Sequence, residues 1–158
     1  MLTKLISIGL FTVIFAFGNV AQAQVMDKKV LSLDGAKKIA AAAEVEARKN
    51  SWNVVIAVVD DGGHLIYLQR LDGTQTGSVQ VAIGKAQTSA GFKRPTKAFE
   101  DAIAGGRNAI LALHGATPLE GGLPVIINGQ VVGAIGVSGV KSVEDAQIAK
   151  AGVDSLSN

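Results

Sequence analysis

The chain has 158 residues, with 15 basic residues (Lys and Arg), 13 acidic residues, 48% hydrophobic residues and no cysteine. This composition is typical of one compact globular domain, and it excludes a disordered chain, a collagen and a disulfide scaffold. The formal net charge of +2 is small and the charges are scattered, so the chain is not expected to bind nucleic acid. Without cysteine, any metal must be held by nitrogen or oxygen ligands or by the thioether of Met26.

Residues 1–23 have the features of an export signal. Lys4 precedes the apolar run Leu5–Phe17, and Ala21–Ala23 has the small-x-small pattern that signal peptidase accepts. We predict cleavage after Ala23, which leaves residues 24–158 as a single domain without a membrane span. An uncleaved anchor is the alternative, but the apolar run has about 13 residues and a span needs about 20.

The first half of the mature chain predicts one helix followed by two strands. Apolar residues recur at three- and four-residue steps after Ser32, which predicts a helix with Ser32 as its N-cap. Residues 53–59 form a β-branched apolar run, which is typical of an interior strand covered on both faces. A tight turn at Asp60–Gly63 then requires the next strand, residues 64–71, to be antiparallel to it.

The second half predicts three helices, a short strand and a hairpin. The helices are expected over residues 78–90, from Thr96, and from Ser142, which we expect to be the cap of the last helix with Asp145 three residues on. Residues 110–113 predict a short strand. Two apolar strands joined by Asn128-Gly129 predict a hairpin with a type I′ turn.

Together these elements predict an α+β fold with one antiparallel sheet of about five strands, on which the first and last helices pack. Strand and helix do not alternate strictly, which counts against a parallel dinucleotide-binding sheet. Gly133, Gly136 and Gly139 also lack the G-x-G-x-x-G spacing. Glycines inside a strand indicate instead a bulge or the close approach of a helix or a ligand.

Four groups of motifs carry a family resemblance. They are Arg70–Gly73; Lys85-Ala86 with Phe92–Thr96; Gly121–Pro124; and Val132–Gly139 with Asp145. In this order and spacing, over essentially the whole mature chain, they resemble the GlcG/HbpS family of haem-binding-protein homologues. The resemblance implies a profilin-like α/β/α sandwich with a five-stranded antiparallel sheet, homo-oligomers, and haem as a cofactor of several members, whereas other members have no settled activity.

A haem site needs an axial iron ligand, an apolar slot and cations for the propionates. His64 and His114 can supply imidazole as metal ligands, and the glycine-rich loop around His114 favours it modestly as a site residue. A surface histidine without a ligand is an equally good interpretation of each. A weak oxygen ligand, Thr96 or Thr117, stays open as well.

The best candidates for holding the propionate carboxylates are Lys85, Lys93 and Arg94, which lie on either side of the helix break at Gly91. The alternative interpretation is a solvated basic face. The amides of the Gly121-Gly122 pair could bind an anion, but a simple turn into the next strand is the favoured interpretation.

Other chemistries find less support in the sequence. There is no G-x-S-x-G motif, and Ser138 has no neighbouring base in sequence, so a serine hydrolase is disfavoured. Asp60-Asp61 is better explained as a pair of solvated turn carboxylates than as a paired acid site. Acidic residues on the predicted helices could bind iron weakly, but helix surfaces carry such charges routinely; these are Glu44, Glu46, Glu144 and Asp145.

The sequence therefore predicts a periplasmic or secreted protein that binds haem noncovalently, for storage, sensing or relay, in a pocket between the glycine-rich hairpin and residues 85–96. Covalent attachment is excluded because C-x-x-C-H is absent. The rival hypothesis is an enzyme or auxiliary protein for a small carboxylate, with Arg94 binding the acid and His114 as general base. A pure interaction scaffold is the third possibility.

Overall fold

The structure, a computed structural model, describes residues 26–156, so the predicted export signal lies outside the described residues. The elements in chain order are α1 (Leu33–Lys49), β1 (Val55–Asp60), β2 (Leu65–Arg70), α2 (Ser78–Phe92), α3 (Lys97–Ala104), the 3-10 helix η1 (Asn108–Ala112), β3 (Gly122–Ile127), β4 (Gln130–Ser138) and α4 (Ser142–Asp154). None of the helices within residues 26–156 has the length and apolar character needed to cross a bilayer.

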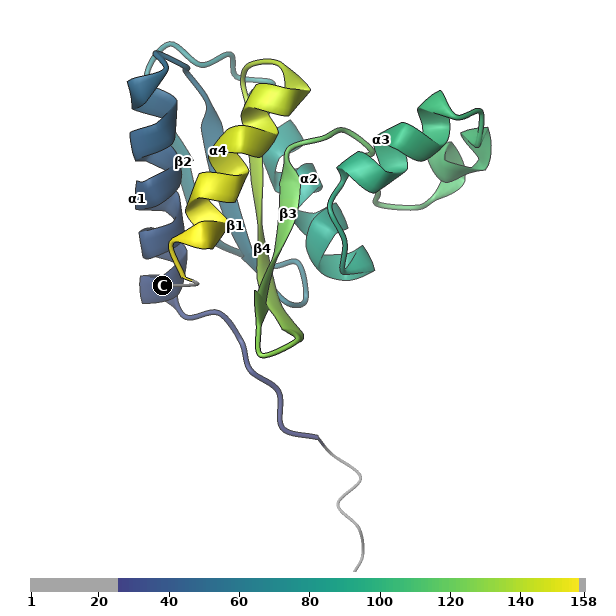
Figure 1. The fold of residues 1–158 in the computed structure, drawn as a ribbon, viewed down its shortest axis with the longest axis horizontal. Helices are drawn as coiled ribbons and strands as arrows, with labels where there is room; N and C mark the ends of the chain where they lie inside the picture. Colours follow the sequence, from purple (N-terminus) through teal and green to yellow (C-terminus); the bar gives the residue numbers. More distant parts are fainter. Residues whose placement is uncertain (1–25, 157–158) are drawn as a thin grey trace, which may run out of the picture.

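The strands form one antiparallel sheet in the order β2-β1-β4-β3. Helices α1 and α4 pack together on one face, and α2 packs on the other, against β1, β3 and β4 (Figure 1). The predicted α+β architecture with an antiparallel sheet is therefore confirmed. Beyond the β3 edge, α3 and η1 project away from the sheet (Figure 1), and we call residues 97–120 the arm.

The prediction of a fifth strand is wrong, because the sheet has four strands. Residues 110–113, expected to be that strand, lie in and just after η1 on the arm. Ile110 is 7% exposed but Leu111 is 67% exposed, so the apolar run does not enter the core of the sheet. A run of four apolar residues is too short for its periodicity to distinguish a strand from a helical turn.

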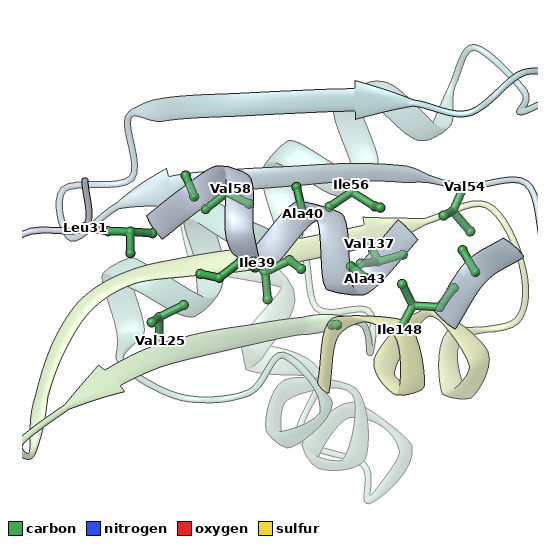
Figure 2. Packing of buried hydrophobic residues seen from close by; sticks show 14 of the residues in the cluster. Leu31, Ile39, Ala40, Ala43, Val54, Ile56, Val58, Val125, Val137 and Ile148 are labelled. Carbon is green, nitrogen blue, oxygen red and sulfur yellow. The ribbon is translucent and has the colours of Figure 1, made fainter. Parts of the chain in front are cut away.

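Strand β1 is buried on both faces, as its apolar run predicts. Ile56 and Val58 point toward α1 and α4, where they pack with Ile39 and Ile148 (Figure 2). The alternate residues of β1 pack toward α2, with Ala57 against Ala82. The side-chain period of two in a strand thus supplies both cores of the sandwich.

Glycine and alanine residues make the contact between α2 and the sheet unusually close. A Cβ atom on Gly136 would overlap the carbonyl oxygen of Ala82, and one on Gly122 would overlap the carbonyl oxygen of Lys85. Gly122 and Gly136 are opposite each other on β3 and β4. These strand glycines therefore mark the close approach of a helix, which is one of the two alternatives that the sequence left open.

Local signals placed the ends of several elements correctly. The Ser32 hydroxyl accepts a hydrogen bond of 3.1 Å from the amide of Gly35, so Ser32 caps α1 as predicted. Asn128 (φ 51°) and Gly129 (φ 76°) form the left-handed turn between β3 and β4, as expected of a type I′ hairpin.

The predicted cap of the last helix is wrong by one residue. The N-cap of α4 is Lys141, and Ser142 is the first helical residue. The amide of Lys141 donates to the Glu144 carboxylate at 3.1 Å. The hydrogen bond from a side chain back to the N-cap, expected of Asp145, is therefore made by Glu144. The Asp145 side chain is buried instead, because it serves a long-range contact with α2.

Candidate functional site

A surface hollow of about 420 Å³ lies at the end of the molecule where α1 begins. We call it the N-terminal hollow, and its lining residues are Met26, Asp27, Lys28, Lys29, Asp61, Lys93, Gln130 and Val131. These residues come from the segment before α1, the β1–β2 turn, the C-terminal end of α2 and the start of β4. Figure 1 shows the segment before α1, the β1–β2 turn and the β3–β4 turn at the same end of the sheet. The volume lies in the range of ordinary small-molecule pockets, about 300–1,000 Å³.

Two contacts hold the segment before α1 in place as one wall of the hollow. The amide of Leu31 donates to the carbonyl of Val132 at 2.9 Å, and the Leu31 side chain is buried. The Lys28 ammonium pairs with the Asp61 carboxylate at 2.9 Å, with the two side chains 68% and 22% exposed. Because exposed pairs contribute only about 0–1 kcal/mol, this ion pair can rearrange when a ligand binds.

The charge around the hollow suits an anionic ligand. Lys29 and Lys93 form no ion pair with another described residue, so their ammonium groups are free for a ligand. Lys93 follows α2 in the left-handed conformation (φ 54°), with its side chain exposed. Asp27 is the other acidic residue of the lining besides Asp61. Two such lysines can each bind one carboxylate group.

Three of the eight residues that line the hollow come from the two segments that were predicted to form a pocket. That pocket was expected between the glycine-rich hairpin and residues 85–96. Over Gly122 and Gly136 the space is closed by the backbone of α2. The three are Lys93, just after α2, and Gln130 and Val131 at the start of β4.

Lys85 lies in the interior of the protein, with a side chain that is 2% exposed. Its ammonium donates to the Asp145 carboxylate at 2.8 Å and to the carbonyl of Val137 at 2.9 Å. Burial raises the pKa of Asp145 above its ordinary value, and the hydrogen bond from Lys85 opposes this rise. A ligand carboxylate could reach Lys85 only by displacing Asp145, so its predicted role as an anchor would require this ion pair to break.

Hydrogen bonds join Thr96, which follows α2, to Gly122 at the start of β3, next to Gly121. The Thr96 hydroxyl accepts from the amide of Gly122 at 2.9 Å, and the amide of Thr96 donates to the carbonyl of Gly122 at 3.0 Å. Gly121 has φ +123°, and a Cβ there would lie 2.8 Å from the Lys85 ammonium. These contacts agree with the favoured interpretation of the glycine pair as a turn. The Thr96 side chain is fully buried.

Arg94 is ordered by two aromatic residues. Its Nε donates to the carbonyl of Phe92 at 3.2 Å, and the guanidinium carbon lies 5.6 Å from the centre of the Phe99 ring. The rings of Phe92 and Phe99 pack edge to face, with centres 5.2 Å apart. The result is an exposed guanidinium next in sequence to Lys93, held by a cation–π contact.

The structure separates the two histidines. His64 lies at the β1–β2 turn, at the same end as the hollow, and its Nδ1 is 3.2 Å from the Asp60 carboxylate with 83% of the side chain exposed. Burial raises the pKa of Asp60, but the hydrogen bonds from His64 and Gly62 outweigh burial, so the pKa lies below its ordinary value. His114 is exposed on the arm and makes no hydrogen bond with another described residue.

Sequence patterns do not indicate most of the lining residues, and they indicate Met26 only as a possible metal ligand. Lys28 and Lys29 follow it after Asp27, and this charged stretch between the predicted cleavage site and the first helix is the signal that could have indicated a site. Within residues 26–156, no group of three or more His, Cys, Asp or Glu side chains could hold a metal ion. The predicted role of Asp60-Asp61 as turn carboxylates agrees with their contacts to His64 and Lys28.

Comparisons with known proteins agree over most of the chain. The family model described as "Haem degrading protein HbpS-like" matches residues 31–154. The protein GlcG of Escherichia coli is 45% identical over 111 residues, which cover 70% of this chain and 83% of that protein. An uncharacterised 15.0 kDa protein of Citrobacter freundii is 36% identical over 131 residues, which cover 80% of this chain and 92% of that protein.

Solved structures share the fold. The protein ORFY of Klebsiella pneumoniae has a TM-score of 0.82 and 31% identity, covering 86% of this chain and 97% of that chain. A variant of HbpS from Streptomyces reticuli has a TM-score of 0.79 and 32% identity, covering 85% of this chain and 92% of that chain. The haem complex of PduOC, at 23% identity and a TM-score of 0.73, covers 80% of this chain and 94% of that chain. At this last identity the likeness concerns the fold alone.

Proposed function

Because the chain belongs to the HbpS-like family, we propose that it is an exported protein that binds haem noncovalently in the N-terminal hollow. The observation that carries this proposal is the combination of an open pocket of about 420 Å³ with two lysines, Lys29 and Lys93, that no described carboxylate neutralises. Haem has two propionates, so this pair of cations matches its charge pattern. The proposed role is to store, sense or relay haem outside the cytoplasm.

The residues of the hollow fit part of a porphyrin. Met26 and Val131 supply apolar surface, Lys29 and Lys93 would hold the propionates, and Lys28 is available if its exposed pair with Asp61 opens. A porphyrin seated there would keep one edge outside the hollow, in solvent or against a second copy of the chain. Bound haem would supply an iron centre with tunable redox potential.

Association of copies remains a prediction, supported by apolar side chains on the arm. Leu111, Leu113 and Leu119 are 67%, 36% and 45% exposed, and a projecting element with such residues is a natural contact for another copy.

Export remains a prediction too, based on the leader pattern of residues 1–23. The rival hypothesis of an enzyme or auxiliary protein for a small carboxylate also remains a prediction, since the guanidinium of Arg94 and the imidazole of His114 are both exposed.

Titration of the mature chain, residues 24–158, with haemin tests this proposal. We expect a saturable shift of the Soret band at one haem per chain. The double variant Lys29→Gln/Lys93→Asn should weaken binding by up to about thirtyfold, because two exposed ion pairs contribute about 0.2–1 kcal/mol each. Asparagine is chosen at position 93 because it tolerates the left-handed backbone there.

The matched control is Lys37→Gln/Lys38→Gln, which removes the same charge from the exposed surface of α1. If affinity falls equally in both double variants, the lysines act only through net charge and the hollow is not the site. A spectrum identical to that of free haemin at all protein concentrations would contradict haem binding itself.

A further inference from the structure

We propose that the outer edge of β2 pairs with the same edge of a second copy of the chain, in antiparallel orientation, so that the two sheets become continuous. This inference goes beyond the proposed function and does not depend on haem binding. It also concerns a different surface from the arm. The two edges of the sheet, β2 and β3 (Figure 1), differ in their backbone hydrogen bonding in the way that such pairing requires.

The outer edge of β2 carries unpaired backbone groups. The amide of Leu71 donates to the carbonyl of Val54 at 3.0 Å, so the backbone of Leu71 faces the β1 side. Backbone groups alternate between the two sides of an antiparallel strand, which turns those of Arg70 and Leu68 outward. Among the described residues, no element pairs with β2 on that side. A row of unpaired amides and carbonyls at a sheet edge is a template for another strand.

The opposite edge, on β3, is closed to such pairing. The amide of Val137 donates to the carbonyl of Gly121 at 3.0 Å, so the backbone groups of Gly122 and then Pro124 turn outward. Thr96 occupies the outward groups of Gly122, because its hydroxyl accepts from the amide at 2.9 Å and its amide donates to the carbonyl at 3.0 Å. Pro124 has no amide hydrogen to offer. Such features protect an edge strand, and β2 lacks them.

The side chains of β2 also suit a position inside a longer sheet. The strand contains neither proline nor lysine, and its one irregularity lies opposite Val58 and Val59, so Tyr67–Arg70 remain regular. Leu65 is 49% exposed, and Leu68 is only partly buried against the cluster formed by β1 and α2. Helix α2 packs against β1, β3 and β4, which leaves this face of β2 partly open. A second β2 would therefore remove apolar surface of both leucines from water.

The charges around β2 favour a second copy of this strand in antiparallel orientation. A twofold axis at Leu68 brings this residue opposite its own copy. Arg70 then lies beside the start of the second β2, next to the acidic turn Asp60-Asp61, and Asp72 comes level with His64 of the second copy. Parallel pairing in register would instead bring Arg70 beside Arg70, and like charges at facing positions are destabilising. The edge is therefore complementary to itself in both hydrogen bonding and charge.

The test measures the mass of the mature chain, residues 24–158, by light scattering over a range of protein concentrations. We expect wild type to associate in even numbers of copies. Leu68→Lys and Leu68→Glu each place like charges opposite each other at the twofold axis, so each variant alone should associate about tenfold more weakly or worse. An equimolar mixture of the two variants should restore association, because a lysine then faces a glutamate.

Two control variants place the same charge elsewhere. Ile126→Lys introduces it on β3, where Ile126 is 50% exposed, and should leave association unchanged. Leu111→Lys introduces it on the arm. If Leu111→Lys separates the copies while Leu68→Lys does not, the arm joins them and the β2 inference is overturned. A mixture of the two Leu68 variants that associates no better than either variant alone would overturn it as well.

Hydrogen exchange of wild type checks the pairing without any substitution, so its result stands even if a Leu68 variant unfolds. The amide hydrogens of Leu68 and Arg70 should exchange slowly in the associated protein and faster on dilution, whereas that of Leu71 should stay slow. A monomeric wild type with fast exchange at Leu68 and Arg70 would overturn the inference and leave the edge open to an extended segment of another protein. Haemin titration is read separately, so a failure of the proposed function is distinguishable from a failure of this pairing.

Discussion

Two lysine–aspartate pairs of almost equal length lie in opposite surroundings. Lys28 and Asp61 are 2.9 Å apart at the surface, with side chains 68% and 22% exposed, whereas Lys85 and Asp145 are 2.8 Å apart with both side chains 2% exposed. The first pair closes one wall of the N-terminal hollow. The second joins α2, on one face of the sheet, to α4 on the other.

The difference in burial decides what each pair can do. Water screens the exposed pair, so exchanging Asp61 for a ligand carboxylate changes the free energy little. The buried pair lost its hydration on folding, and neither charge can be left alone in the interior without a large penalty. The same chemistry therefore gives an exchangeable contact at the hollow and a fixed connection inside the sandwich.

Breaking the buried pair should have the largest effect on stability. Lys85→Met leaves the Asp145 carboxylate buried without its cation, and we expect a loss of about 3–5 kcal/mol in the free energy of unfolding. The matched change at the surface, Lys28→Met, should cost less than about 1 kcal/mol. Urea unfolding of the two variants and wild type measures both values.

The double variant Lys85→Met/Asp145→Leu separates the loss of a partner from the loss of the pair itself. Because both charges are then absent, most of the lost stability should return. Equal, small losses in Lys85→Met and Lys28→Met would show that water reaches the inner pair, and the comparison between the two surroundings would no longer hold.

The second prediction contrasts the closed contact between α2 and the sheet with the exposed surface of the same helix. Gly136→Ala would force a methyl group against the Ala82 carbonyl, and we expect a loss of about 1–3 kcal/mol or more. Gly91 lies in α2 itself, and a methyl group added there has no atom within 4 Å, so Gly91→Ala should stabilise the protein by up to about 1 kcal/mol.

Thermal unfolding of these two glycine variants supplies the measurement, and haemin titration of Gly91→Ala confirms that the hollow is intact. If Gly136→Ala unfolds at the temperature of wild type, α2 can move away from the sheet at little cost. The space over the glycines would then be available to a ligand, as the sequence predicted.

Local signals account for the elements that the sequence predicted well. The Ser32 cap, the buried run of β1 and the Asn128-Gly129 turn each depend on a few neighbouring residues. The fifth strand failed because residues 110–113 are too few to carry a distinctive period. Here the tertiary structure decides between a strand and the 3-10 helix.

The candidate site could be predicted only in part, because its residues meet through long-range contacts. Lys85 had the right chemistry to hold a carboxylate, but its partner Asp145 is 60 residues away and no local pattern indicates the pairing. Lys93, just after α2, and Val131, on β4, line one hollow although 38 residues separate them in the chain. Their meeting depends on the register of β3 and β4, which composition and periodicity do not determine.

The smallest effect is the pH dependence that Asp145 contributes. Burial raises the pKa of Asp145 in the folded protein above its ordinary value of 3.8, with the Lys85 pair opposing. Between 3.8 and the raised pKa, the folded state keeps a proton that the unfolded chain has released, so stability falls as pH rises through this window. Asp145→Asn has no such proton at this position.

Subtracting the unfolding free energy of Asp145→Asn from that of wild type isolates this contribution. Hydrogen bonds from Gln69 and Gln147 lower the pKa values of Glu44 and Glu46, so these two groups make stability rise with pH. Their contribution is the same in both proteins and cancels in the difference. The difference should be greatest below pH 3.8, decline as pH rises, and level off above the folded pKa. A difference that grows with pH would mean that Lys85 lowers the pKa of Asp145 despite its burial, and that the inner pair resembles the outer pair in its ionisation.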